Sequence, residues 1–175
     1  MKDLIRQKIA VDQKVADLLA KQMQIESTSS AAYLAMAGWC AMQGLEKTSD
    51  FYYKQSDEER SHMLKIHKYL ADMGVHPVAA PASEVQYEFS SLKEVLELTL
   101  DMEIAVTEAI HELLLTCKKV NDYRTELFLH WFVDEQVEEE YVARRALEIL
   151  ELVGEDPRGR YMFDERINSI SYSAE

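Results

Sequence analysis

Four long stretches of this chain carry apolar side chains at alternating intervals of three and four residues, and a shorter stretch follows them. This spacing puts the apolar positions on one face of an α-helix. We predict helices over the ranges Val11–Gln43, Leu45–Met73, Ser91–Lys119, Asp122–Val153 and Pro157–Ser169. The breaks fall at Gly44, at Gly74, at the pair Asn121 and Asp122, and at Gly154, which are residues that commonly end helices.

One predicted connection is much longer than the others. Residues Val75–Ser90 include Pro77 and Pro81 and have no helical periodicity. At about 3.3 Å per extended residue, this segment can reach about 50 Å, whereas a helix of about 28 residues is about 42 Å long. The segment can therefore run the length of a bundle and let the second and third helices lie parallel. We predict one all-α domain, residues 1–175, formed by a four-helix bundle with one long crossover and a short fifth C-terminal helix.

A carboxylate interrupts the apolar face near the middle of each long helix. These residues are Glu26, Glu59, Glu103 and Glu139, and His62 follows Glu59 by one helical turn. Because helices of similar length in a bundle have their midpoints at one level, we expect these five side chains to meet in a buried layer, called here the carboxylate layer. A single glutamate in such a position usually reaches out to solvent, and a single histidine is usually hydrogen-bonded. The repetition of this pattern on four helices at one level instead favours a ligand that all of these side chains share.

The carboxylate layer needs a compensating positive charge, since burying even one unpaired charge costs several kcal/mol. No Lys or Arg occupies a core-facing position of the four predicted helices. Metal ions are the simplest source of that charge, and a set of carboxylates with one imidazole suits iron or manganese better than zinc. The sequence therefore predicts a two-metal site inside the bundle.

Other side chains near the carboxylate layer give a weaker signal. Tyr33 lies two turns after Glu26 on the same face, and it either packs in the core or meets the site. Trp131 stands one residue from the core-facing positions of its helix and can equally be an interface aromatic. The acids that flank the layer, here called the outer acids, are by themselves typical of a solvated helix face: Glu58, Glu135 and Glu138.

Composition narrows the classes of function. The 175-residue chain has a net charge of −13, which favours solubility and attracts cations, and the absence of a Lys/Arg cluster disfavours nucleic acid as a partner. The N-terminal residues have no apolar signal segment, and no apolar run reaches the roughly 20 residues that cross a bilayer. We therefore expect a cytoplasmic protein without a membrane partner. Cys40 and Cys117 are expected to be buried reduced thiols, with a disulfide as the alternative.

With these residues identified, the chain resembles the ferritins over nearly its whole length, and among them the bacterial non-haem type. The resemblance is strongest in QMQIESTSSAAYLAMAGWC, QSDEERSHM, the helix around Glu103 and HWFVDEQVEEEY. It implies a ferritin-like bundle and an iron-storage protein that oxidises Fe(II) with O2 or H2O2. It also implies self-association into a hollow shell of twenty-four subunits that holds ferric mineral, without haem.

The resemblance assigns metal-binding roles to particular residues. Positions that match the first metal site of ferritins are Glu26, Glu59 and His62. Positions that match the second are Glu59 as a bridge and Glu103, with Gln136 and Glu139 near the open side. Tyr33 matches the tyrosine beside the centre. The third iron site of bacterial ferritins matches Glu58, Glu135, Glu138 and Glu139.

Two features depart from related patterns. The fourth helix has Gln136 and Glu139 where bacterioferritins and rubrerythrins have a second Glu-x-x-His, which argues against both classes and against a permanently held di-iron cofactor. Glu126 matches one of two acids that line the three-fold channel of animal ferritins, but Leu129 stands at the position of the other. The sequence therefore leaves the iron entry route undecided. The alternatives are a storage shell without oxidase activity, a di-metal peroxide-consuming redox enzyme on the same bundle, and a plain structural bundle.

Overall fold

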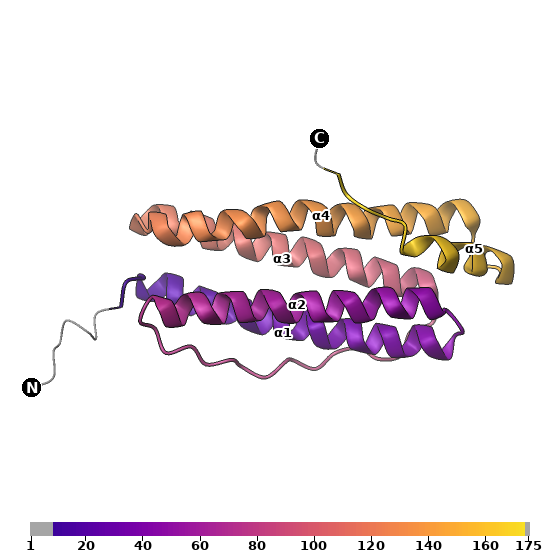
Figure 1. Cartoon of the computed structure of the whole chain (residues 1–175), viewed down its shortest axis with the longest axis horizontal. Coiled ribbons are helices and arrows are strands. Elements are labelled where there is room, and N and C mark those ends of the chain that lie inside the picture. Colours follow the sequence, from indigo (N-terminus) through magenta and orange to yellow (C-terminus); the bar gives the residue numbers. More distant parts are fainter. Residues whose placement is uncertain (1–8, 174–175) are drawn as a thin grey trace, which may run out of the picture.

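The structure, a computed structural model, describes residues 9–173, and these form helices joined by loops, without a strand in that range. The helices are α1 (Gln13–Met42), α2 (Glu46–Asp72), α3 (Leu92–Val120), α4 (Tyr123–Val153) and α5 (Pro157–Ile167). The first four lie side by side as a bundle, and α5 lies at one end of it (Figure 1). The predicted all-α class is confirmed, and the predicted helix ends lie within two residues of the observed ones.

Local sequence accounts for where the helices begin and end. The side chains of Asp12, Ser91, Asp122 and Asp156 accept hydrogen bonds from backbone N–H groups in the first turns of α1, α3, α4 and α5, which would otherwise lack partners. Asn121 follows the last turn of α3 with φ of 59°, a left-handed conformation that ends a helix. These capping residues account for where α1, α3, α4 and α5 begin and for where α3 ends.

The long crossover lets α2 and α3 run in the same direction, as the length of the segment predicts. In Figure 1 it travels back along the bundle from the end of α2 to the start of α3. Gln24 on α1 donates its Nε2 hydrogen to the Pro81 carbonyl oxygen at 3.3 Å, and the Ser83 backbone N–H donates to Thr28 Oγ1 at 3.1 Å. The crossover is therefore held against α1.

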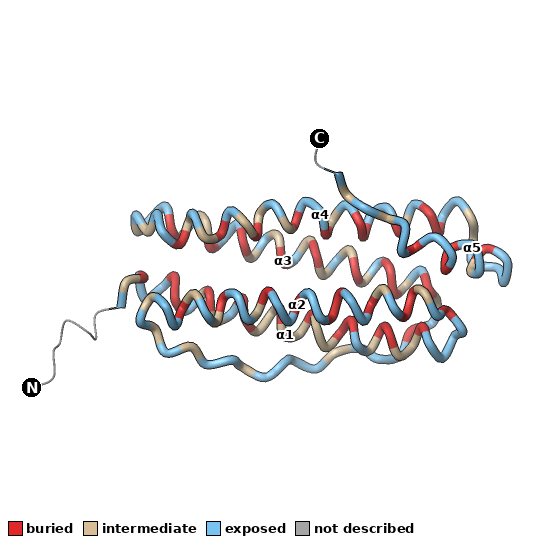
Figure 2. Tube along the Cα trace, viewed as in Figure 1, coloured by how far each residue is buried: buried red, intermediate tan, exposed pale blue. Residues whose placement is uncertain are grey.

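The apolar core consists of two clusters along the bundle axis. One contains Met36, Leu96 and Phe163 and lies towards α5, and the other contains Leu19 and Ile110 and lies towards the opposite end. Figure 2 shows buried segments on the inward faces of all four long helices. Between the clusters the buried positions include charged residues, so the polar layer has apolar packing on either side of it.

Helix α5 is fixed to the bundle by a buried carboxylate. Asp164, 8% exposed, accepts hydrogen bonds from the Thr48 backbone N–H at 2.8 Å and from Thr48 Oγ1 at 2.7 Å. Thr48 lies in the first turn of α2, where a negative charge is favoured by the helix dipole. Gly159 allows the close approach of α5 to α4, since a Cβ there would lie 2.3 Å from the Gly154 carbonyl oxygen.

The two cysteines are free thiols in buried positions, as one of the two alternatives predicts. Burial raises the pKa of Cys40 to about 12 and that of Cys117 to about 11. Both thiols are therefore protonated and poorly nucleophilic near neutral pH. Within residues 9–173, no helix combines the length and apolarity needed to cross a membrane.

Candidate metal centre

The carboxylate layer expected from the sequence is present in the middle of the bundle. Each long helix contributes one glutamate to it, and α2 also contributes the histidine. The exposed fractions of the side chains are 1% for Glu26, 2% for Glu59, 3% for His62, 1% for Glu103 and 6% for Glu139. Five ionisable groups are thus almost completely withdrawn from water at one level of the core.

The half of the layer formed by α1 and α2, here called the first half, has few protein partners. Ligand atoms of Glu26, Glu59 and His62 all lie within 4.8 Å of one another. Glu26 Oε1 accepts a hydrogen bond from Gln22 Nε2 at 2.9 Å, but Glu26 Oε2 has no hydrogen-bond partner among the described residues. His62 Nδ1 lies 3.3 Å from Glu59 Oε2. A buried carboxylate oxygen without a partner remains available to bind a cation.

The half formed by α3 and α4, here called the second half, comprises Glu103, Gln136 and Glu139, and its carboxylates have hydrogen-bond donors. The Tyr33 hydroxyl donates to Glu103 Oε1, and Gln136 Nε2 donates to Glu103 Oε2 at 3.2 Å. Gln55 Nε2 approaches Glu139 Oε2 at 3.2 Å. Tyr33 is therefore both a core residue and a direct contact of the layer.

Burial and mutual repulsion raise the pKa values of the layer carboxylates. Burial raises the pKa of Glu26 and of Glu59 well above the usual range, and the next cause is a neighbouring carboxylate, Glu59 for Glu26 and Glu103 for Glu59. Burial also raises the pKa of Glu103, and it raises that of Glu139 to about 9 together with the charge of Glu103. A divalent cation among these groups would stabilise their charged forms.

The outer acids lie beside the layer but are not equivalent. Ligand atoms of Glu58 and Glu135 lie within 4.8 Å of each other and of an imidazole nitrogen of His62, so this histidine borders both groups. Glu58 is exposed and Glu135 is half-buried. Glu138 is exposed and is not part of this three-residue group, although its charge is among those that raise the pKa of Glu135 after burial.

Aromatic side chains pack against the imidazole of His62. The Trp131 ring meets it edge-on with ring centroids 5.4 Å apart, and the Phe132 ring lies at 6.1 Å. Lys65 Nζ lies 3.5 Å from the centroid of a Trp131 ring, a cation–π contact. Trp131 therefore packs directly against the histidine, a contact that its position in the sequence did not reveal.

Three polar residues that support the carboxylates were missed as contributors to the site. Gln22 and Gln55 each lie one helical turn before a layer glutamate, and both are buried. Thr107 Oγ1 lies 3.4 Å from Gln136 Nε2. Gln22 had a signal in the sequence, since a glutamine four residues before a core-facing glutamate is well placed to donate to it. Gln55 had none, because it donates to Glu139 on α4. Thr107 had none, because its partners lie on another helix.

The start of α4 differs from what a surface channel would need. Leu129 is completely buried in the apolar core. The Glu126 carboxylate lies 3.9 Å from Lys118 Nζ, so its charge has a cationic neighbour. Leu129 therefore contributes packing rather than a side chain at the surface.

Comparison with known proteins gives a consistent result. A family profile described as "Ferritin-like domain" matches residues 16–153. The chain is 37% identical over 164 residues to a "Probable bacterial non-heme ferritin-like protein" of Haemophilus influenzae, covering 94% of this chain and 99% of that protein. It is 35% identical over 162 residues to a "Bacterial non-heme ferritin" of Staphylococcus saprophyticus, covering 93% and 97%.

Solved structures show the same likeness in three dimensions. A humanized archaeal ferritin superposes with a TM-score of 0.88 at 30% identity, over 94% of this chain and all of that one. An open-pore ferritin from Archaeoglobus fulgidus superposes with a TM-score of 0.88 at 31% identity, over 92% and 98% of the two chains. The resemblance seen in the sequence is thereby confirmed, and the chain belongs to the ferritin family.

Proposed function

We propose that this chain stores iron and that its carboxylate layer oxidises Fe(II). Membership of the ferritin family supports iron storage. The observation that carries the oxidase function is the burial of four glutamates with raised pKa values at one level of the core. Within residues 9–173, none of the four pairs with a Lys or Arg side chain. A cationic substrate would supply the positive charge that such a layer requires.

The donor set of the layer suits Fe(II) as that substrate. Carboxylate oxygens with a single imidazole nitrogen favour iron or manganese over zinc. In the proposed arrangement Glu26, Glu59 and His62 hold one ion, and Glu59 also bridges to a second ion held by Glu103, with Gln136 and Glu139 near the open side. Two Fe(II) ions then supply the two electrons that reduce one O2 to the peroxide level.

The difference between the two halves of the layer supports iron as a transient substrate rather than a permanent cofactor. In the first half, a carboxylate oxygen of Glu26 has no hydrogen-bond donor to displace within residues 9–173. In the second half, donors from Tyr33 and Gln136 compete with a metal ion for the Glu103 oxygens. Weaker binding in the second half lets oxidised iron leave for storage as ferric mineral.

The outer acids are proposed to form a third iron site together with Glu139. Glu58 and Glu135 lie close to each other beside His62, and the charges of all three outer acids help to raise the pKa of Glu139 after burial and Glu103. An ion there would be partly exposed, since Glu58 is exposed and Glu135 is half-buried. Such an ion could supply a further electron or receive iron that leaves the layer.

Storage also requires an enclosed space that one bundle lacks. We propose a closed shell of twenty-four copies of this chain in the cytoplasm, as the ferritin relationship suggests. Free buried thiols are compatible with a reducing compartment. Haem is not part of the proposal.

The test combines oxidation kinetics with assembly size. Purified metal-free protein is mixed with about two Fe(II) per chain in aerated buffer, and absorbance and O2 consumption are followed together. We expect oxidation much faster than in buffer alone, and a particle far larger than a dimer by light scattering. Oxidation no faster than in buffer rejects the oxidase function, and a monomer or dimer under all conditions rejects the shell.

A further inference from the structure

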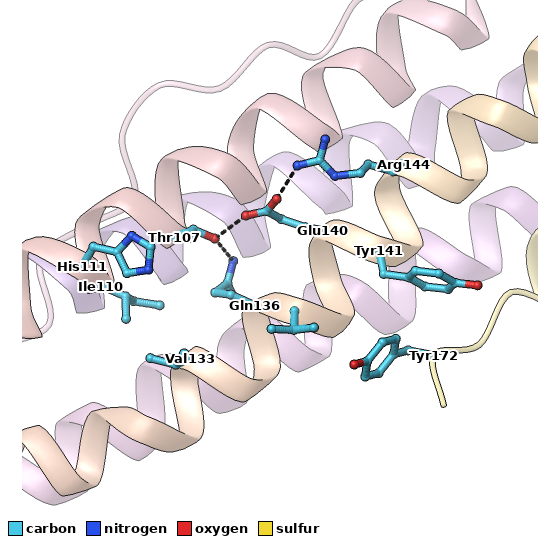
Figure 3. Close-up of a pocket in the computed structure, with 10 residues that line it drawn as sticks. Thr107, Ile110, His111, Val133, Gln136, Glu140, Tyr141, Arg144 and Tyr172 are labelled. Atoms are coloured by element: carbon cyan, nitrogen blue, oxygen red, sulfur yellow. Dashed lines mark hydrogen bonds and ion pairs between the residues drawn. The ribbon is translucent and has the colours of Figure 1, made fainter. Parts of the chain in front are cut away.

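A surface pocket of about 460 Å³ lies between α3 and α4, next to the second half of the carboxylate layer. Figure 3 shows residues that line it, on the two helices and in the C-terminal segment that follows α5. Gln136 lines this pocket and also donates to the Glu103 carboxylate. It is 5% exposed, so its side chain forms a wall between the pocket and the buried site.

A continuous line of hydrogen bonds leads from Gln136 across this pocket. Gln136 Nε2 lies 3.4 Å from Thr107 Oγ1, and Thr107 Oγ1 lies 2.8 Å from Glu140 Oε1. The other oxygen of this carboxylate, Glu140 Oε2, accepts from Arg144 Nη2 at 2.5 Å. The dashed lines in Figure 3 follow this sequence of contacts from the arginine to the glutamine amide.

The Arg144 guanidinium, at the outer end of this line, sets the direction of every hydrogen bond in it. A guanidinium has only donors, so the Glu140 carboxylate that is paired with Arg144 acts as an acceptor. The Thr107 hydroxyl has one hydrogen, and it is used in the bond to Glu140. Towards Gln136 the hydroxyl oxygen can therefore only accept, and the amide must turn its NH2 group to it.

The orientation of this amide matters because its two ends differ in chemistry. The amide nitrogen has no lone pair available for a metal ion, whereas the carbonyl oxygen is a metal ligand. Gln136 Nε2 donates to the carboxylate and to the main-chain carbonyl oxygen of Glu103, each at 3.2 Å, and Thr107 Oγ1 is a third acceptor at 3.4 Å. The Gln136 carbonyl oxygen is therefore the end left to coordinate a cation. The same nitrogen also holds the Glu103 carboxylate in place.

We propose that Thr107 and Glu140 are positioning residues that fix the Gln136 amide, and through it Glu103, for the second metal position. The proposal rests on the proposed function, because that function supplies the metal. Neither residue touches the cation itself. They act through the donor-to-acceptor direction of the hydrogen bonds between Arg144 and Gln136. The ion pair of Arg144 and Glu140 at the protein surface sets this direction.

The place of these residues makes the proposal testable without disturbing the core. The Glu140 side chain is 22% exposed and that of Arg144 is 53% exposed. Thr107 is half-buried at the pocket wall. Substitutions of similar size there leave both apolar clusters of the bundle unchanged.

The main test is Thr107→Val, which keeps the shape of the side chain and removes its hydroxyl. Metal-free protein is titrated anaerobically with Co(II), followed by visible absorption and calorimetry, so that binding is measured without iron oxidation. We expect the first Co(II) to bind as in the wild type and the second to bind about tenfold more weakly. Thr107→Ser restores the hydroxyl and should restore the second affinity.

A matched pair of variants tests the role of the ion pair. Glu140→Gln replaces the fixed acceptor with an amide that can also donate, so we expect a smaller loss at the second Co(II). Glu148→Gln breaks a comparable pair on the same helix, in which Arg145 Nη1 and Glu148 Oε2 are 2.8 Å apart, and should leave both affinities unchanged.

The outcomes separate this proposal from the proposed function. Two Co(II) ions in the wild type with an unchanged second affinity in Thr107→Val overturn the positioning role. An equal loss in Glu148→Gln, or no recovery in Thr107→Ser, also overturns it. If the wild type binds no pair of ions, the proposed function itself fails.

Discussion

The two halves of the carboxylate layer satisfy their buried charges in different ways. In the first half, Glu26 retains an oxygen without a hydrogen-bond partner among the described residues, and Glu59 has the His62 imidazole as its neighbour. In the second half, Glu103 accepts from Tyr33 and Gln136. Each half buries its carboxylates to a similar degree, so the contrast lies in the partners and not in exposure.

This contrast predicts unequal affinities for metal ions. A cation that enters the first half relieves an unpaired buried oxygen, which is a strong stabilisation because an unsatisfied buried acceptor is costly. A cation that enters the second half must displace hydrogen bonds that already stabilise the carboxylate. The first half should therefore hold its ion tightly, and the second half should bind and release iron.

The largest expected effect comes from the glutamate that serves both halves. Glu59→Gln removes the charge that both ions share, so rapid Fe(II) oxidation should fall by at least about 100-fold. The same change removes a buried carboxylate, so the melting temperature of the metal-free protein should rise. Stopped-flow absorbance and calorimetry measure the two effects.

The exposed Glu112 on the surface of α3 provides the control for that change. Glu112→Gln should alter neither oxidation nor stability. Rapid oxidation that persists in Glu59→Gln would show that the layer is not the site of reaction.

A change in the second half should sharpen the comparison. Glu103→Ala removes the carboxylate to which Tyr33 and Gln136 donate, so one Co(II) per chain should still bind tightly while the second is lost. Two-electron reduction of O2 should disappear with it. Two ions of unchanged affinity would mean that α3 does not contribute to the pair.

Much of this arrangement could be predicted from the periodicity of the chain. The helices and the long crossover follow from local patterns, and the layer follows from the coincidence of the helix midpoints. Hydrogen-bond partners could not be predicted in the same way, because they depend on side-chain direction between helices that are distant in sequence. Gln55, which reaches Glu139 on α4, and the line from Gln136 to Arg144 were therefore visible only in the structure.

The pH dependence of stability tests the charge balance of the metal-free layer. Burial, and then the charge of Glu103, raise the pKa of Glu139 from its ordinary value of 4.5 to about 9, so the folded state binds this proton more tightly than the unfolded state. Stability should then fall as pH rises through the window from about 4.5 to about 9. The melting temperature should drop by roughly 10 °C between pH 5.5 and pH 9.

Two additions identify the origin of that pH dependence. Glu139→Gln should flatten the profile, and a saturating divalent cation should raise the melting temperature most at the alkaline end, where the carboxylates are charged. A melting temperature that is constant or rises between pH 5.5 and pH 9 would mean that burial does not raise the pKa values of the layer carboxylates.

The smallest effect is expected from the outer acids. Glu138→Ala changes an exposed residue outside the group of Glu58, His62 and Glu135, so the rapid oxidation of two irons should persist. The ratio of iron oxidised to O2 consumed, and the later movement of oxidised iron, should change. Collapse of the rapid phase would place Glu138 in the paired site, and no change in either quantity would leave it as a solvated surface residue.

The unequal pair of metal positions can be observed most directly by anomalous diffraction. Crystals of the metal-free protein are soaked anaerobically with increasing Fe(II), and data are collected on both sides of the iron edge. We predict two peaks inside the bundle, the first between Glu26, Glu59 and His62, and the second, filled only at higher Fe(II), between Glu59 and Glu103. Iron bound only at the outer acids, or a second position that fills before the first, would contradict this account.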